Sequence, residues 1–154
     1  MTAAGDGHQL SPRELAAWRG FLRTHAALVK ALDAELVAAH ELPLSSYEVL
    51  LHLDNATEER MRMSELADSV LLSRSGVTRL VDRLVAEGLI ERAACATDRR
   101  GWFAALTDPG RARLREARPT HLAGVRKLFL RRFSELELDE LAGFWERVQP
   151  GASG

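Results

Sequence analysis

The side chains of this chain that could do chemistry together are arginines and small hydroxyl residues in residues 73–101. This segment holds six arginines and four acidic residues, an excess of +2, whereas residues 10–60 hold five basic and eight acidic residues, a sum of −3. The net charge of all 154 residues is −1, so the positive excess is local. Guanidinium groups pair with phosphates and with the guanine edge in the DNA major groove, so this segment is a candidate nucleic-acid surface.

Other kinds of site have little support in the sequence. There is no G-x-S-x-G, no glycine-rich phosphate loop and no Cys/His pair of catalytic spacing, and the five histidines lack the spacing of metal ligands. The single cysteine, Cys95, excludes an internal disulfide and fits a reducing compartment. Residues 1–10 show no secretory signal, and no apolar run of about 18 residues could cross a bilayer. We expect a cytoplasmic protein without enzymatic activity, cofactor, metal or membrane contact.

A helix and a hairpin must position the basic segment. Ser73 can cap a helix that ends at Gly88, with one apolar face and one polar face. The apolar face carries Val77, Leu80, Val81, Leu84 and Val85, and the opposite face carries Ser75, Thr78, Arg79, Asp82 and Arg83. Residues 89–106 are predicted to form a β-hairpin with its turn at 97–101. A shorter helix is expected to begin near Ser64.

Longer helices flank this unit. Ser11 and Glu14 form a capping box, and apolar residues then alternate in spacings of three and four from Leu15 to Leu36, a coiled-coil-like seam that needs a partner helix. Further capping boxes predict helices that begin at Ser45 with Glu48 and at Ser134 with Glu137. Another helix opens at Thr107 and Pro109, and Pro119 is expected to bend or interrupt it.

The order helix, turn, helix, hairpin in residues 64–106 is the winged helix-turn-helix plan. We therefore predict a mainly α (α+β) fold in one domain over residues 1–154. Dimerisation helices occupy 11–40 and 108–149, the winged helix-turn-helix occupies 45–106, and the tails are 1–10 and 150–154, of which the second should be disordered.

Two parts of this unit resemble the MarR family of bacterial transcriptional regulators. The segment DRRG at 98–101, followed by LTDPG at 106–110, is similar to the family's wing signature, D-x-R-G then L-T-x-x-G. The segments MSELA at 63–67 and SGVTRLVDRL at 75–84 resemble its two helix-turn-helix helices. With the flanking helices, the likeness covers roughly residues 11–148.

The resemblance implies a sequence-specific DNA-binding regulator. Arg79 would reach a base edge, and Arg100 would enter the minor groove with its guanidinium held by Asp98. The implied partner is double-stranded DNA with an inverted-repeat operator, bound by an intertwined homodimer. The predicted DNA-binding residues are Ser64, Ser73, Ser75, Gly76, Thr78, Arg79, Arg83, Asp98, Arg99 and Arg100.

The family's usual mode is repression released by a small aromatic or phenolic effector, bound between the dimer helices and the winged domain. Trp18 and His25 are the candidate effector residues, although packing along the helical seam also explains them.

Three alternatives stay open. Arg79 and Arg83 could form surface ion pairs with Asp82 and Glu87 instead of contacting DNA. The winged helix could bind a protein instead of DNA, although such a domain should have lost the arginines of the helix and the hairpin. Cys95 could make the regulator redox-responsive, but peroxide-sensing relatives keep their reactive cysteine near the start of the first helix, where this chain has none.

Overall fold

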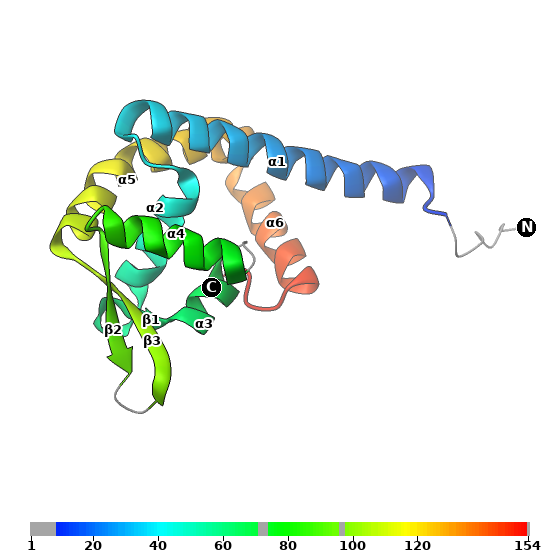
Figure 1. Cartoon of the computed structure of the whole chain (residues 1–154). Coiled ribbons are helices and arrows are strands. Elements are labelled where there is room, and N and C mark those ends of the chain that lie inside the picture. Colours follow the sequence, from blue (N-terminus) through cyan, green and yellow to red (C-terminus); the bar gives the residue numbers. More distant parts are fainter. Residues whose placement is uncertain (1–8, 71–73, 96–97, 154) are drawn as a thin grey trace, which may run out of the picture.

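The computed structural model describes residues 9–70, 74–95 and 98–153 and has a mainly helical fold with one small sheet (Figure 1). The helices are α1 (Pro12–His40), α2 (Leu44–Asn55), α3 (Met63–Ser69), α4 (Arg74–Ala86), α5 (Asp108–Leu128) and α6 (Glu135–Val148), with short 3-10 turns η1 (Thr57–Glu59) and η2 (Leu130–Arg132). The strands are β1 (Arg60–Arg62), β2 (Ile90–Cys95) and β3 (Asp98–Leu106). The predicted fold class is confirmed.

Helix α1 begins where the sequence predicts. The Ser11 amide donates to Glu14 Oε2 at 2.8 Å and the Glu14 amide donates to Ser11 Oγ at 3.3 Å, which completes the capping box. The helix runs unbroken to His40, and its N-terminal half projects beyond the rest of the molecule (Figure 1). Leu36 is buried in the core, whereas Trp18 near the other end is 53% exposed. The apolar seam is therefore buried at its C-terminal end and largely exposed toward its N-terminal end.

Helix α2 begins differently from the prediction. Its first residue is Leu44, after Pro43, and no side chain caps it, so the capping box of Ser45 with Glu48 is wrong. Asp33 of α1 instead accepts a hydrogen bond from the Leu44 amide at 2.8 Å. This contact from another helix satisfies an amide at the helix start, a role that a local cap would otherwise fill.

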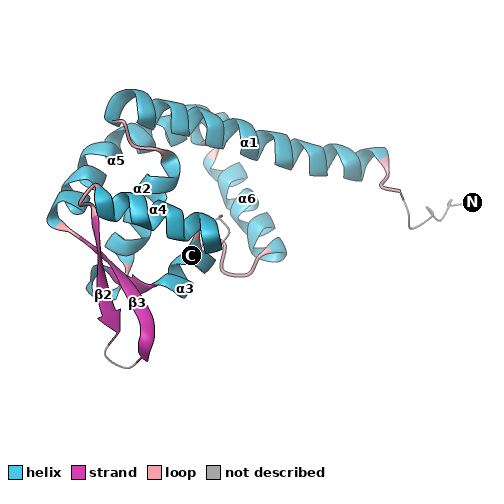
Figure 2. Ribbon diagram, viewed as in Figure 1, coloured by secondary structure: helices cyan, strands magenta, loops and turns pink. Residues whose placement is uncertain are grey.

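The sheet is antiparallel with strand order β1-β3-β2, and it lies at one end of the molecule, where β2 and β3 form a projecting hairpin (Figure 2). We call this hairpin the wing. The inner face of the sheet joins one core with α1, α2, α3, α4 and α5. That core includes Leu36, Tyr47, Leu50, Leu53, Leu66, Val81, Leu84, Ile90, Ala104, Leu106 and Leu114.

The wing departs from the prediction near its tip. Residues 98–101 were expected in the turn, but they belong to β3. Ala94 pairs with Trp102 while the next residue of β2, Cys95, pairs with Asp98. The register therefore slips at a β-bulge, and three residues of β3 lie between these two pairs. A bulge of this kind bends the strand near the tip and raises its local twist.

The C-terminal helices bring one correction and one confirmation. Pro119 lies inside α5 without interrupting it. Pro119 and Arg115 are both exposed, so water can reach the carbonyl that the proline leaves without a helical donor. Helix α6 begins at the predicted capping box, in which the Ser134 amide donates to Glu137 Oε2 at 2.8 Å.

The chain after α6 is folded back where disorder was predicted. The Glu146 carboxylate accepts the amides of Gly151 and Ser153 at 2.9 and 2.7 Å, and these hydrogen bonds hold residues 150–153 in a turn. In the described ranges, no helix is long and apolar enough to span a membrane.

Candidate nucleic-acid interface

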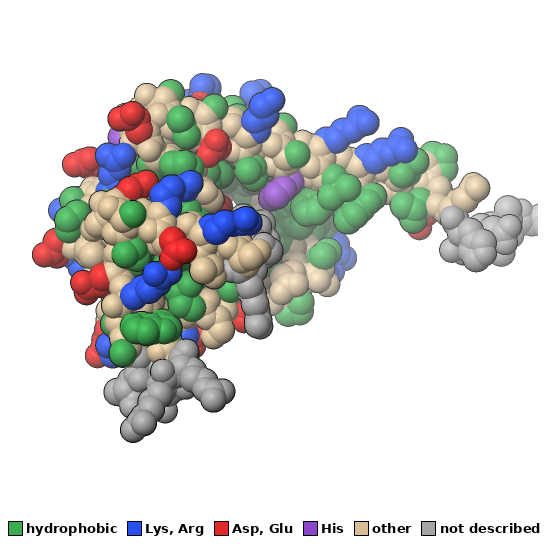
Figure 3. All heavy atoms as spheres, in the orientation of Figure 1, with side chains coloured by type: hydrophobic (Ala, Val, Ile, Leu, Met, Phe, Trp, Pro, Cys, Tyr) green, Lys and Arg blue, Asp and Glu red, His purple; other side chains and the backbone are tan. Residues whose placement is uncertain are grey.

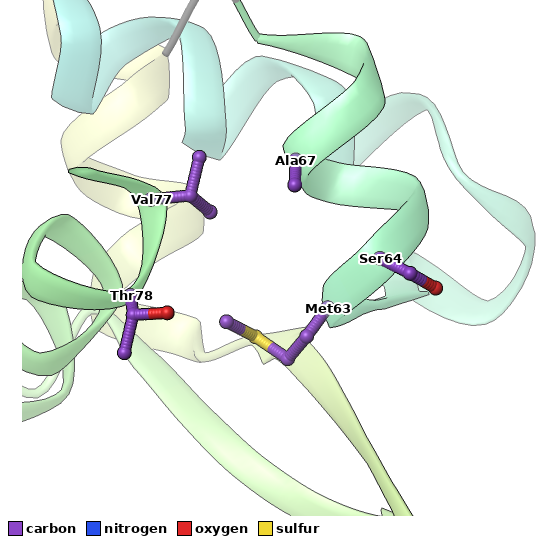
Figure 4. Close-up of a pocket in the computed structure, with 5 residues that line it drawn as sticks. All are labelled: Met63, Ser64, Ala67, Val77 and Thr78. Atoms are coloured by element: carbon purple, nitrogen blue, oxygen red, sulfur yellow. The ribbon is translucent and has the colours of Figure 1, made fainter. Parts of the chain in front are cut away.

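Helices α3 and α4 form the helix-turn-helix. In α3, Leu66 is buried in the core and Ser64 is exposed, while Glu65 accepts a hydrogen bond from the Arg62 amide at 3.1 Å. The outer surface between the two helices is hollowed into a shallow cleft of about 200 Å³ (Figure 4). The cleft is lined by Met63, Ser64, Ala67, Val77 and Thr78.

Helix α4 has the two predicted faces. Val77, Leu80, Val81 and Leu84 are buried, which fixes the helix against the core. The opposite face carries the exposed residues Ser75, Thr78, Arg79, Asp82 and Arg83. The helix ends at Ala86 and is followed by Gly88, whose φ of 75° lies in the left-handed region, and the Leu89 amide donates to the Leu84 carbonyl at 2.9 Å. This Schellman motif stops α4 where the wing begins.

The charged residues of α4 have different surroundings. Arg83 donates to Ser46 Oγ of α2 at 3.0 Å and its Nε lies 4.0 Å from Glu87. Asp82 pairs with Arg92 of β2, not with a residue of its own helix. Arg79 has no ion-pair partner in the part of the chain that the structure describes. Of Arg79 and Arg83, the two arginines of α4 whose side chains are described, Arg83 contacts neighbouring residues and Arg79 makes no ion pair with the described residues.

The wing residues are placed by their backbone alone. Asp98, Arg99 and Arg100 lie in β3 beside the bulge, and Cys95 ends β2. The expected contact between Asp98 and the Arg100 guanidinium lies outside the described side chains, and Ser73 lies outside the described residues.

The fold brings most described members of the predicted DNA set together. Ser64 is exposed on α3, Ser75, Thr78 and Arg79 are exposed on the neighbouring face of α4, and Gly76 is partly buried beside them. The sequence patterns assign no role to Arg92 and Trp102 of the wing. The contact of Arg92 with Asp82 depends on how the wing packs against α4, and a single sequence does not show this packing.

The two candidate effector residues do not share one cleft. His25 lines a cleft of about 530 Å³ between α1 and α2, with Lys30, Asp33, Ser45 and Glu48 among its other lining residues, and Trp18 is not part of it. Burial raises the pKa of the half-buried Glu48 carboxyl, against the opposing charges of His52 and His25. Trp18 instead lies near Phe21, with ring centroids 6.1 Å apart.

A two-helix motif followed by a hairpin wing, flanked by long helices, defines a winged helix-turn-helix protein. A model of the MarR family matches residues 40–101. The solved structure of AbsC, a MarR family transcriptional regulator from Streptomyces coelicolor, is similar with a TM-score of 0.84 and 32% identity, over 92% of this chain and 95% of AbsC. Sco3205, a MarR family regulator from the same organism solved in complex with DNA, gives a TM-score of 0.87 and 30% identity over 97% of this chain and 94% of Sco3205.

The HTH-type transcriptional regulator MhqR of Bacillus subtilis (strain 168) is 31% identical over 86 residues, or 56% of this chain. The matched part spans 59% of the length of MhqR. Taken together with the near-complete match to AbsC, these comparisons show that the chain belongs to the MarR family of transcriptional regulators.

Proposed function

We propose that this protein binds double-stranded DNA as a homodimer and regulates transcription, with α4 in the major groove. The observation that carries the proposal is the exposed face of α4. It places Arg79, without an ion pair among the described residues, beside the short polar side chains of Ser75 and Thr78. Arginine pairs with guanine O6 and N7 in the major groove, and short hydroxyl side chains allow a helix to approach the bases.

The wing would contact the adjacent minor groove. Two of its arginines, Arg99 and Arg100, lie next to the bulge in β3 near the tip of the projection. Arginine on a slim projection suits a narrow, electronegative minor groove. Sco3205, whose overall fold is similar, has been solved in complex with DNA, which supports DNA binding by this fold.

The dimer would form through the exposed parts of α1 and α6. Figure 3 shows hydrophobic side chains gathered on the projecting part of α1 and toward α6. The large apolar side chains exposed there are Trp18, Phe21, Leu22, Val29, Leu136, Phe144, Trp145 and Val148. A surface of this kind marks an interaction site, and a second copy would give the two-fold symmetry that matches an inverted-repeat operator.

Regulation would take the form of repression released by a small aromatic acid or phenol. The cleft between α1 and α2 supports a ligand site, because it joins apolar walls to His25, Lys30 and Glu48 where the long helix meets the winged unit. A ligand that prefers the DNA-incompetent state would lower affinity for the operator by its differential binding.

The test is fluorescence anisotropy with the intergenic DNA upstream of the protein's own gene, against a scrambled duplex of equal length and composition. We expect binding of the native sequence at least about 1,000-fold tighter, the lower end of typical specific recognition. Equal affinity for both duplexes would contradict the proposal. If this protein binds neither duplex but binds another protein from the same cells, the result would favour the protein-interaction alternative.

A further inference from the structure

Trp102 is a large apolar side chain in an unexpected place. It belongs to β3, next to the bulge that precedes it, and it is 51% exposed. Hydrophobic side chains lie at the outer end of the described part of the wing (Figure 3). An indole that is half in water presents both an apolar face and a polar Nε1–H to a partner, which suits a binding role.

The strand register places Trp102 on the inner face of the wing. Side chains of a strand alternate between faces, so Trp102, Ala104 and Leu106 share one face. Ala104 and Leu106 are buried in the core, and Arg92, which pairs across the sheet with Ala104, contacts Asp82 of α4. The inner face is thus turned toward α4. On this face Trp102 lies two residues closer to the wing tip than Ala104, the strand partner of Arg92.

We propose that Trp102 packs against the sugar-phosphate strand that runs between α4 and the wing when the protein binds DNA. This inference rests on the proposed function. With α4 in a major groove and the wing in the next minor groove, the backbone that separates the two grooves must pass through the gap between them. The indole offers an apolar face to deoxyribose carbons, and its Nε1–H can donate to a phosphate oxygen.

The charges in the gap allow a phosphate to come close. Asp82 alone would repel a phosphate, but its pairing with Arg92 makes this part of the gap neutral. The proposed contact is with the backbone, so it should strengthen binding to every sequence and leave the choice of sequence to α4 and the wing tip.

The first test uses Trp102 as its own probe. The chain has three tryptophans, at 18, 102 and 145. Because Trp18 and Trp145 belong to the proposed dimer surface, both are kept, and the emission of the Trp102→Phe variant is subtracted from that of the parent to isolate the signal of Trp102. Adding operator duplex should change its emission and lower its quenching by acrylamide at least about two-fold, because DNA would cover the exposed half of the ring. Duplex binding with unchanged emission and unchanged quenching would overturn the inference while leaving the proposed function intact.

The second test compares two substitutions by anisotropy. Trp102→Ala should weaken binding about tenfold on operator and on scrambled duplex alike, whereas Trp102→Phe should retain most of the affinity. A loss confined to the operator would show base reading and overturn the backbone contact. Unchanged affinity with a lower mass in light scattering would instead make Trp102 part of a protein interface. If the parent binds no DNA, the proposed function fails, and this inference fails with it.

Discussion

Gly110 lets α5 start directly against the loop that follows α4. Thr107 caps this helix by accepting the Gly110 amide at 3.1 Å, and its own hydroxyl donates to the Gly88 carbonyl at 2.7 Å. A Cβ on Gly110 would overlap the carbonyl oxygen of Leu89. The glycine therefore joins the end of α4, the base of the wing and the start of α5 in one close contact.

Gly110→Ala should accordingly destabilise the fold by about 1–3 kcal/mol, because backbone has to move to make room. Gly20→Ala is the matched control, since a Cβ there has nothing within 4 Å and the site is in a helix interior. We expect it to stabilise by about 0.5–1 kcal/mol. Urea unfolding measures both free energies, and a Gly110→Ala variant as stable as the parent would contradict the close contact.

Glu48 makes stability depend on pH. Because burial raises the pKa of its carboxyl, the folded state holds this proton more tightly than the unfolded state. The stabilising contribution of this proton is present at pH values below the pKa that Glu48 has in the unfolded chain, and it is lost as pH rises through the raised pKa of the folded state. Glu48→Gln should therefore melt higher than the parent at pH 8 and close to the parent at pH 4.

Thermal melts across that pH range, with the exposed Glu116→Gln as control, measure this difference. A Glu48→Gln variant that melts below the parent at pH 8 would show that the charged carboxylate is needed in the α1–α2 cleft. The control should follow the parent at every pH.

At the scale of elements, the C-terminal part of α4 is held by contacts with α2 and with the wing. Arg83 reaches Ser46 of α2, and Asp82 pairs with Arg92 of the wing. These contacts fix the direction in which the exposed face of α4 points. Arg83, which sequence reasoning assigned to DNA, thus has a structural contact that accounts for its position.

Arg83→Ala should cost about 1 kcal/mol of unfolding free energy, because the hydroxyl of the buried Ser46 loses its partner. Arg23→Ala, at an exposed position of α1, should stay within about 0.5 kcal/mol of the parent. Guanidinium unfolding of the two variants side by side is the measurement, and equal stability would make the Ser46 contact incidental.

Sequence predicted these elements well where the signal is local. The capping boxes at Ser11 and Ser134 and the glycine stop at Gly88 each depend on residues within a few positions, and each is confirmed. The box at Ser45 failed because Asp33, distant in sequence, satisfies the Leu44 amide. The bulge in β3 and the pairing of Arg92 with Asp82 depend on strand register and packing, which no single segment encodes.

At the scale of the whole molecule, the apolar seam of α1 is buried by described residues at its C-terminal end and largely exposed toward its N-terminal end. Leu36 packs in the core, while Trp18 and Leu22 remain exposed. We expect light scattering at micromolar concentration to give about twice 17.1 kDa. A stable folded monomer of the parent would contradict the dimer.

Leu22→Glu should shift that equilibrium toward the monomer, because it places a charge in the proposed interface without disturbing the core. Arg23→Glu is the control. Leu22 belongs to the apolar seam, whereas Arg23, the next residue, lies on another face of the helix. Dimers of equal strength in both variants would place the interface elsewhere.

The central claim is that α4 reads bases through Arg79. Arg79→Ala should cost about 1–3 kcal/mol of binding free energy on the operator and much less on a scrambled duplex, because only the operator presents the matching base edge. Arg23→Ala, also the loss of one exposed arginine, should leave the ratio of the two affinities unchanged. The ratio of operator to scrambled affinity, measured by anisotropy at fixed salt, is the most direct test. A drop of about fivefold or more for Arg79→Ala supports the claim, whereas an equal loss on both duplexes would contradict it.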